Sequence, residues 1–291
     1  MKATRSTRHR AEKAPVFQFA GMVLFLLVSL VLTTPSAAQS VTEGGAGRVQ
    51  FVDGNEAFTT YPEDPTQVVD PGRGDSEEGD LRLDYVPYLI FDQTKVGTGT
   101  TQLTAHAQYY ADGHTPTGNF AQVTDARRDS SGWVLSVTQE TAFTHESQKD
   151  QTLKGTVLSI GHIWTNSIWL TSQTTGEPRI DKDRIDLTPG KSCIIAKAGE
   201  NAGHGRWSIA FGSTGQTQRG GEQTVWPQYY LDKTPVLLKD SHPVIQSYGY
   251  DVSQQQAYYN TAITLIIPAQ KENLAAGVYH TSLLWRLVAA P

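Results

Sequence analysis

The chain has 291 residues, with 24 Lys and Arg against 29 Asp and Glu, and Cys193 is its single cysteine. A net charge of −5 provides no broad positive field, which argues against a nucleic-acid-binding or anionic-membrane-binding protein. One cysteine excludes an internal disulfide, and the length allows one large β domain or two small ones.

Residues 1–38 have the three parts of a secretory signal peptide. A basic leader is followed by a 14-residue apolar run from Phe19 to Leu32 and by the small residues Ser36-Ala37-Ala38. The run is shorter than the ~20 residues that span a bilayer, and an uncleaved anchor is the alternative interpretation. Cleavage after Ala38 would leave 19 basic and 28 acidic residues, a net charge of −9. We therefore expect a secreted protein without a transmembrane segment after cleavage.

Residues 39–80 predict one N-terminal strand and a long acidic loop. Arg48 to Val52 is strand-like, and Asp53-Gly54 is a turn signal. Residues 53–80 are rich in Pro, Gly, Asp and Glu and poor in apolar residues, which predicts a surface loop or tether. Its carboxylates could hold Ca²⁺, but they lack the spacing of a known calcium loop, so we assign no metal and no cofactor. These carboxylates are Asp70, Asp75, Glu77, Glu78 and Asp80.

From residue 81 to residue 291, short apolar segments alternate with turn residues. Trp133, Leu135 and Val137 occupy every second position, the period of a half-buried strand. Residues 273–276 predict at most one helical turn. We expect an all-β fold, a single Greek-key or Ig-like β-sandwich with long loops, whose main body is 81–291 and which the N-terminal strand joins. The expected strands are 81–86, 89–91, 120–124, 133–138, 157–160, 163–164, 194–195, 207–211, 262–267 and 279–287.

The sequence contains no catalytic motif that would indicate an enzyme. A nucleophile elbow, a phosphate-binding loop and a zinc-binding helix motif are absent. His145-Glu146 is the nearest acid/base pair, and its polar surroundings predict a solvated loop. The carboxylates of residues 181–186 alternate with basic residues, as in a solvated hairpin, whereas a glycosidase needs two carboxylates facing one cleft. We therefore do not expect catalysis, and we name no catalytic or metal-binding residue.

Aromatic side chains are the better candidates for binding, because an aromatic face can stack on a sugar ring. The pairs Trp133 with Leu135 and Trp285 with Leu287 each point to one side of a strand, which places them in a core or in a binding site, and we favour the core. Several tyrosines lie in segments rich in Gln, Pro and Gly, so we expect them in exposed loops. They are Tyr229, Tyr230, Tyr248, Tyr250, Tyr258 and Tyr259.

Two of the predicted strands resemble the paired motifs of the WxL-domain surface proteins of Gram-positive bacteria. They are Gly132–Gln139 and Gly277–Leu287, each with a W-x-L tripeptide. Two positions differ from the family pattern: Asp92 stands where Gly is common, and Thr156 stands where Ala is common. Further segments resemble the family in the same order, namely Gly47–Phe51, Asp84–Pro87 with Phe91, Gln122–Asp125, Leu153–Gly155 and Lys197–Gly199.

The resemblance implies non-covalent attachment to cell-wall peptidoglycan, with both W-x-L motifs required. It also implies possible cooperation with co-encoded, membrane-anchored surface proteins. The leading hypothesis is a wall-attachment domain at the bacterial surface, in which Trp133, Leu135, Trp285 and Leu287 organise the site. One alternative is a module that binds another surface protein, and a third is a secreted carbohydrate-active enzyme, which the missing carboxylate pair disfavours.

Overall fold

The computed structural model describes residues 57–95, 99–128, 131–168, 176–239, 249–270 and 274–290, all within the compact unit Val52–Pro291. The described residues form strands and no helix, so the all-β prediction is confirmed, and none of these ranges contains a helix that could cross a membrane. The strands are β1 (Thr59–Tyr61), β2 (Asp64–Val69), β3 (Leu81–Tyr85), β4 (Thr101–His106), β5 (Asn119–Asp125), β6 (Trp133–Gln139), β7 (Thr144–His145), β8 (Val157–Ile160), β9 (Ile163–Asn166), β10 (Arg179–Ile180), β11 (Ile185–Leu187), β12 (Ser192–Ala198), β13 (Gly205–Phe211), β14 (Val225–Pro227), β15 (Tyr258–Ile267), β16 (Tyr279–His280) and β17 (Leu283–Ala289).

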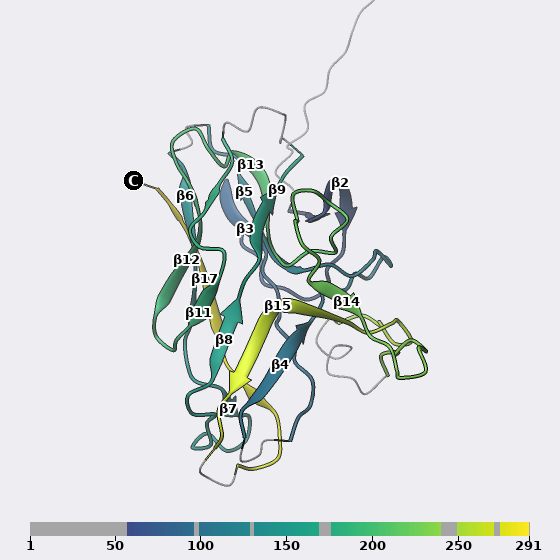
Figure 1. Cartoon of the computed structure of the whole chain (residues 1–291). Coiled ribbons are helices and arrows are strands. Elements are labelled where there is room, and N and C mark those ends of the chain that lie inside the picture. The colour runs from purple at the N-terminus through teal and green to yellow at the C-terminus, as the bar shows by residue number, and fades with distance from the viewer. Residues whose placement is uncertain are drawn as a thin grey trace, which may run out of the picture. The chain divides into compact units, whose positions relative to one another are not determined.

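Three antiparallel sheets build the body of the molecule (Figure 1). The β6 sheet has the order β10-β12-β6-β17, and the β5 sheet has the order β3-β5-β13-β9. The β15 sheet has the order β11-β8-β15-β14, with β4 along the other edge of β15. The β1-β2 hairpin and a two-stranded sheet of β16 and β7, which are distant in sequence, complete the described part of the fold. Neighbouring strands are often distant in sequence, so the sheets are held by long-range pairing.

The inward faces of all three sheets meet in one hydrophobic core. Leu135 from the β6 sheet, Val123 from the β5 sheet and Ile263 from the β15 sheet are each fully buried in it. Alternate residues of each strand point into this core, as the period of two in the sequence predicts. Since burial of a large aliphatic side chain contributes about 1.5–3 kcal/mol, the shared core is the main stabilising element.

The structure corrects the prediction of a continuous loop over residues 53–80. Part of this range, residues 59–69, forms the β1-β2 hairpin, which hydrogen bonds anchor to the β5 sheet. Gln122 of β5 accepts from the backbone N and Oγ1 of Thr60 at 2.8 and 2.9 Å, and its Nε2 donates to the carbonyl of Phe58 at 2.7 Å. The segment has few apolar residues, so composition predicted a loop. Hydrogen bonds to a distant strand, and the packing of Val69 and Tyr61 against a small core, order it instead.

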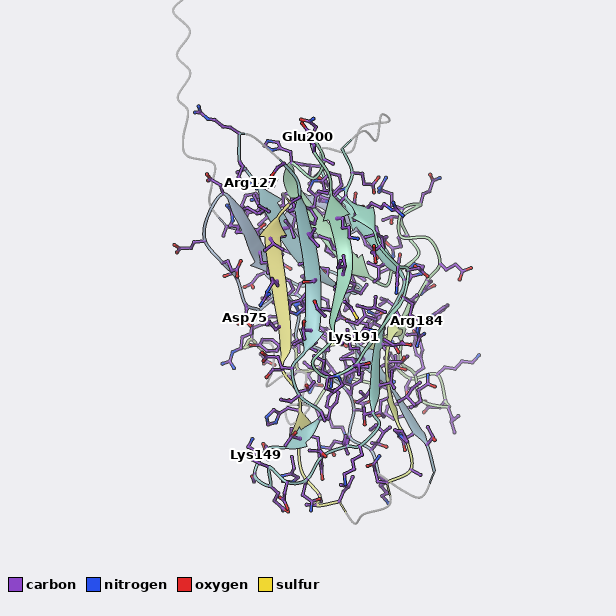
Figure 2. All side chains as sticks on the ribbon, turned by 90° about the vertical axis from the view of Figure 1, so that its left-hand side faces the viewer. Asp75, Arg127, Lys149, Arg184, Lys191 and Glu200 are labelled. Atoms are coloured by element: carbon purple, nitrogen blue, oxygen red, sulfur yellow. The ribbon has the colours of Figure 1, made fainter. Side chains whose placement is uncertain are left out.

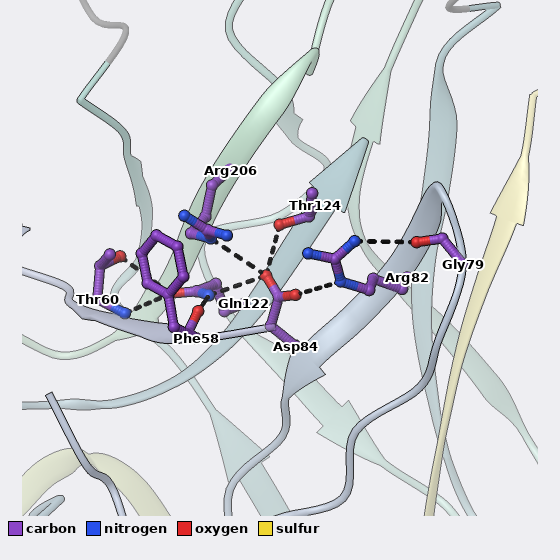
Figure 3. Close-up of polar contacts among 8 residues, drawn as sticks. All are labelled: Phe58, Thr60, Gly79, Arg82, Asp84, Gln122, Thr124 and Arg206. Carbon is purple, nitrogen blue, oxygen red and sulfur yellow. Dashed lines mark hydrogen bonds and ion pairs between the residues drawn. The ribbon is translucent and has the colours of Figure 1, made fainter. Parts of the chain in front are cut away.

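A buried ionic cluster lies between this anchor and the β5 sheet (Figure 3). The carboxylate of Asp84 accepts from Arg82 Nε at 2.7 Å, Gln122 Nε2 at 2.9 Å and Thr124 Oγ1 at 2.5 Å, and Arg206 Nε lies 3.5 Å away. Burial lowers the pKa of the Arg206 guanidinium below its ordinary value. The Phe58 ring lies over this guanidinium, at 3.4 Å from its carbon. The cluster therefore joins β3, β5 and β13 to the segment that leads into β1.

Four features of the sequence analysis fall outside the described residues. They are the signal peptide (1–38), the N-terminal strand at Arg48 to Val52, the family segment Gly47–Phe51 and Tyr248.

Candidate functional site

The two W-x-L strands lie side by side in the β6 sheet. β17 pairs with β6 in an uninterrupted antiparallel register that places Leu287 opposite Leu135 and Trp285 opposite Val137. Directly opposite residues of an antiparallel pair share one face, so both tryptophans and both leucines point inward. The two motifs, about 150 residues apart in the chain, are thus parts of one surface of one sheet.

Trp133 is a core residue and has no exposed surface. Its side chain has 0 % exposure, and its indole Nε1 donates to the carbonyl of Gly203 at 3.0 Å. Leu135 is also fully buried. The loop that contains Gly203 approaches so closely that a Cβ at that position would lie 2.6 Å from the indole nitrogen. A ligand in solution therefore has no access to this indole.

Trp285 and Leu287 extend the same packing toward the β5 sheet. Trp285 is buried, and its ring stacks on Phe211 of β13 with centroids 5.8 Å apart. Leu287 is half-buried and packs against the same core. Of the two roles that the W-x-L side chains could have, this geometry favours the core: they fasten the β6 sheet to the β5 sheet.

The tyrosines expected in exposed loops divide into two groups. Tyr229 and Tyr230 are exposed, on a hairpin in which Tyr229 pairs with Pro235 and the tip residue Leu231 is fully exposed. Tyr250 and Tyr258 are half-buried against a small core that supports this hairpin. The loop prediction is wrong for Tyr258 and Tyr259, which begin strand β15.

A groove on the β15 sheet lies beside this hairpin. It has a volume of about 410 Å³, within the usual range for ligand sites. Trp226 of the edge strand β14 lies on one side and is 49 % exposed, whereas most of the other tryptophans are buried. Trp226 pairs directly with Tyr259, so the two aromatic side chains share one face of the sheet. The lining residues are Asp92, Gln102, Leu103, Thr104, Trp226, Pro227, Gln228, Tyr259 and Thr261.

Hydrogen-bonding groups line the groove around this aromatic surface. The side chains of Gln102, Thr104 and Gln228 form no hydrogen bond with any other residue that the structure describes. Two of the three are amides, each of which can donate and accept at once. An exposed indole beside amides and hydroxyls matches the two kinds of surface on a sugar ring, its C–H face and its hydroxyl rim.

Asp92 is held in a defined orientation at this groove. His106 Nε2 lies 2.8 Å from its Oδ1, and the hydroxyl of Tyr259 donates to its Oδ2. The Tyr259 and His106 rings pack with centroids 4.7 Å apart. Burial, followed by the contact with Asp92, raises the pKa of the Tyr259 phenol above its ordinary value, so the hydroxyl remains a donor at neutral pH. Asp92, which stands where the family commonly has Gly, is thus a hydrogen-bond acceptor with a fixed orientation at the groove.

A larger hollow of about 530 Å³ beside β9 is a weaker candidate. Several of its polar groups are already engaged with one another or with the backbone. Arg219 and Thr165 both contact the carboxylate of Glu177, and the buried indole of Trp164 donates to the carbonyl of Gly212 at 3.0 Å. A ligand there would have to displace these internal contacts, so the Trp226 groove is the better site.

The residues considered for catalysis have structural roles. His145 is buried, which corrects the expectation of a solvated loop, and its Nδ1 accepts from the backbone N of Ser147 and Gln148 at 3.1 Å each. The carboxylates of Asp181 and Asp186 are partly exposed and pair with basic neighbours. Within the described ranges, no three His, Cys, Asp or Glu side chains come together as metal ligands.

The family comparison agrees with the geometry of the paired strands. The model of the WxL domain, described as surface cell wall-binding, matches residues 38–291. This chain belongs to the WxL-domain family. No curated protein and no solved structure gave a match. WxL domains are a family of binding domains, and membership places the protein at the cell surface in association with the wall.

The structure gives physical roles to several WxL family segments. Asp84, of the segment 84–87, accepts hydrogen bonds from Gln122 and Thr124, of the segment 122–125, so the two segments meet in the buried ionic cluster. Ala198, of the segment 197–199, packs closely against Gly132, where a Cβ would lie 2.2 Å from the Ala198 carbonyl. These WxL segments therefore build the scaffold, and the exposed groove lies elsewhere.

Sequence reasoning missed Trp226 and its polar neighbours as a site. Trp226 precedes a proline and has no alternating apolar pattern around it, which is a weak signal of an exposed edge strand. Nothing in the sequence connects it with Gln102 or Asp92, because β15 alone brings β4 and β14 together.

Proposed function

We propose that this WxL protein is secreted by a Gram-positive cell and attaches non-covalently to the glycan strands of peptidoglycan through the Trp226 groove. The observation that carries the proposal is the half-exposed indole of Trp226 beside the amides of Gln102 and Gln228. A net negative chain gains nothing from general charge attraction to an anionic wall, so stacking and hydrogen bonding must supply the affinity.

The neighbouring hairpin extends this contact surface. Tyr229, Tyr230 and Leu231 are exposed beside the groove, and tyrosine combines a flat apolar face with a hydroxyl. A glycan strand is long, and a row of aromatic side chains can contact several of its sugars in succession. The hairpin therefore adds affinity, while the groove selects the sugar.

The W-x-L residues serve this function indirectly. Trp133, Leu135, Trp285 and Leu287 hold the β6 sheet against the core that also supports the β15 sheet. Loss of either motif would abolish attachment through unfolding. Among the described residues that line the groove, Asp92 is the single carboxylate and has no facing partner of the kind that glycoside hydrolysis requires, so we propose binding without turnover.

The test is sedimentation of the chain lacking residues 1–38 with purified peptidoglycan, freed of protein and of phosphate polymers. We expect Trp226→Ala to weaken binding about 30-fold, the effect of a central aromatic anchor, without changing the melting temperature. The exposed aromatic Tyr88, which does not line the groove, provides the matched control Tyr88→Ala. Equal binding of the Trp226→Ala variant and the unmodified chain would refute the groove as the site.

A further inference from the structure

The outward face of the β6 sheet is a second exposed surface, and its residue types differ from those of the groove. Figure 2 looks onto this face, with β17 in yellow beside β6 and β12. Because residues alternate, the positions between the buried W-x-L residues point outward. On β17 these are Leu284, Arg286 and Val288, of which Leu284 and Val288 are 42 % and 48 % exposed.

Aliphatic side chains continue across the neighbouring strands. Val288 pairs with Val134 of β6, and Arg286 pairs with Ser136, which in turn faces Ile194 of β12. Val134 and Ile194 are half-buried. A strand face that points to solvent usually carries polar residues, so this aliphatic group is suited to contact apolar side chains of a partner.

The charged residues at the outward strand positions of this face are basic, and Asp181, directly after β10, is an acidic group beside them. Arg286 lies between Leu284 and Val288, Lys197 lies opposite Val134, and Arg179 of β10 lies opposite Lys197. The outward positions of these four strands contain no Asp or Glu, although acidic residues outnumber basic ones in the chain.

Internal pairing neutralises one of these three cations. Lys197 pairs with Asp181 at 3.0 Å. Arg179 and Arg286 form no ion pair with any residue that the structure describes. A positive charge that has no counter-charge among the described residues of an otherwise acidic molecule calls for a complementary negative group on the partner.

We propose that this face, centred on Arg286, docks an acidic segment of a protein partner at the cell surface. Charge complementarity requires carboxylates opposite Arg286 and Arg179, and the aliphatic positions require apolar side chains between them. A phosphate polymer of the wall would satisfy the cations and leave Leu284, Val288, Val134 and Ile194 uncovered. A second copy in face-to-face contact would present the same cations, Arg179 and Arg286, and would not supply the carboxylates that they require.

Residues of this face can be changed without disturbing the core, because their side chains point away from it. Arg286→Glu reverses the central charge, and Leu284→Ser removes an exposed apolar contact. Lys149→Glu is the matched charge control, since Lys149 is exposed on a loop outside the four strands of this face (Figure 2). Unchanged melting temperatures establish that each variant is folded.

The experiment compares three probes: purified peptidoglycan, protein-free walls that retain their phosphate polymers, and envelopes that retain their proteins. We expect Arg286→Glu to weaken binding to the protein-bearing envelopes about ten-fold, and Leu284→Ser to weaken it as well, while Lys149→Glu has no effect. A photo-crosslinker at Val288 should label an acidic segment of one surface protein, and Arg286→Glu should remove that product.

Two results would overturn the proposal. A loss of affinity of Arg286→Glu for protein-free walls with phosphate polymers would identify the polymer as the occupant. Unchanged binding to all three probes would show that nothing docks on this face. Trp226→Ala tests the groove separately with peptidoglycan, so either proposal can fail while the other stands.

Discussion

Replacement of Trp133 by alanine tests whether the W-x-L indoles are core residues or ligand contacts. Trp133 is fully buried, and removal of such a ring costs about 3–5 kcal/mol through lost burial and the cavity left behind. The Gly203 carbonyl also loses its indole donor, and an unsatisfied buried group costs about 1–3 kcal/mol. We expect a total of about 4–8 kcal/mol, a large share of the roughly 5–15 kcal/mol that stabilises a typical domain.

The assay is urea unfolding of the chain lacking residues 1–38, followed by circular dichroism, with peptidoglycan sedimentation in parallel. Trp133→Ala should shift the unfolding midpoint strongly to lower urea or prevent folding. Trp133→Phe restores most of the apolar contact without the hydrogen bond and should cost about 1–3 kcal/mol. Trp226→Ala removes a half-exposed ring and should leave the midpoint nearly unchanged. A Trp133→Ala variant that unfolds at the unmodified midpoint, yet fails to bind, would refute the core assignment.

Three further predictions address other parts of the structure. Asp84→Asn leaves the guanidinium of Arg82 without its buried counter-charge and should destabilise the fold by about 3–5 kcal/mol in the same urea assay. Because the folded state raises the pKa of Tyr259 above its ordinary value near 10, the neutral phenol stabilises the fold at pH values below 10. This stabilisation is lost as the pH rises above 10. Alkaline unfolding of the unmodified chain and of Tyr259→Phe measures the difference. Gly132→Ala would combine a backbone φ of +88° with a Cβ 2.2 Å from the Ala198 carbonyl, so it should lower the melting temperature, whereas the open position Gly99 should tolerate alanine.

Local pattern predicted most strands of the shared core and the direction of their side chains, but it missed β4 and β14, and the expected strand 89–91 contains only an isolated bridge at Phe91. The period of two in residues 133–137 and 283–287 assigns Trp133 and Trp285 to the inward face before any pairing is known. Composition was a poorer guide where hydrogen bonds to distant strands impose order. Residues 59–69 have few apolar side chains, and their hairpin depends on Gln122, more than 50 residues away.

The amino-acid sequence by itself determined the class of the protein, an all-β WxL chain with two tryptophan strands that each have one buried face, and it predicts an export signal. Tertiary structure alone decided that these strands are neighbours, that their indoles are inaccessible, and that Trp226, Gln102 and Asp92 share a groove. The physical reason is that side-chain direction follows from the alternation within a single strand. A binding surface, in contrast, requires pairing between strands whose local sequences do not indicate which strand each will pair with.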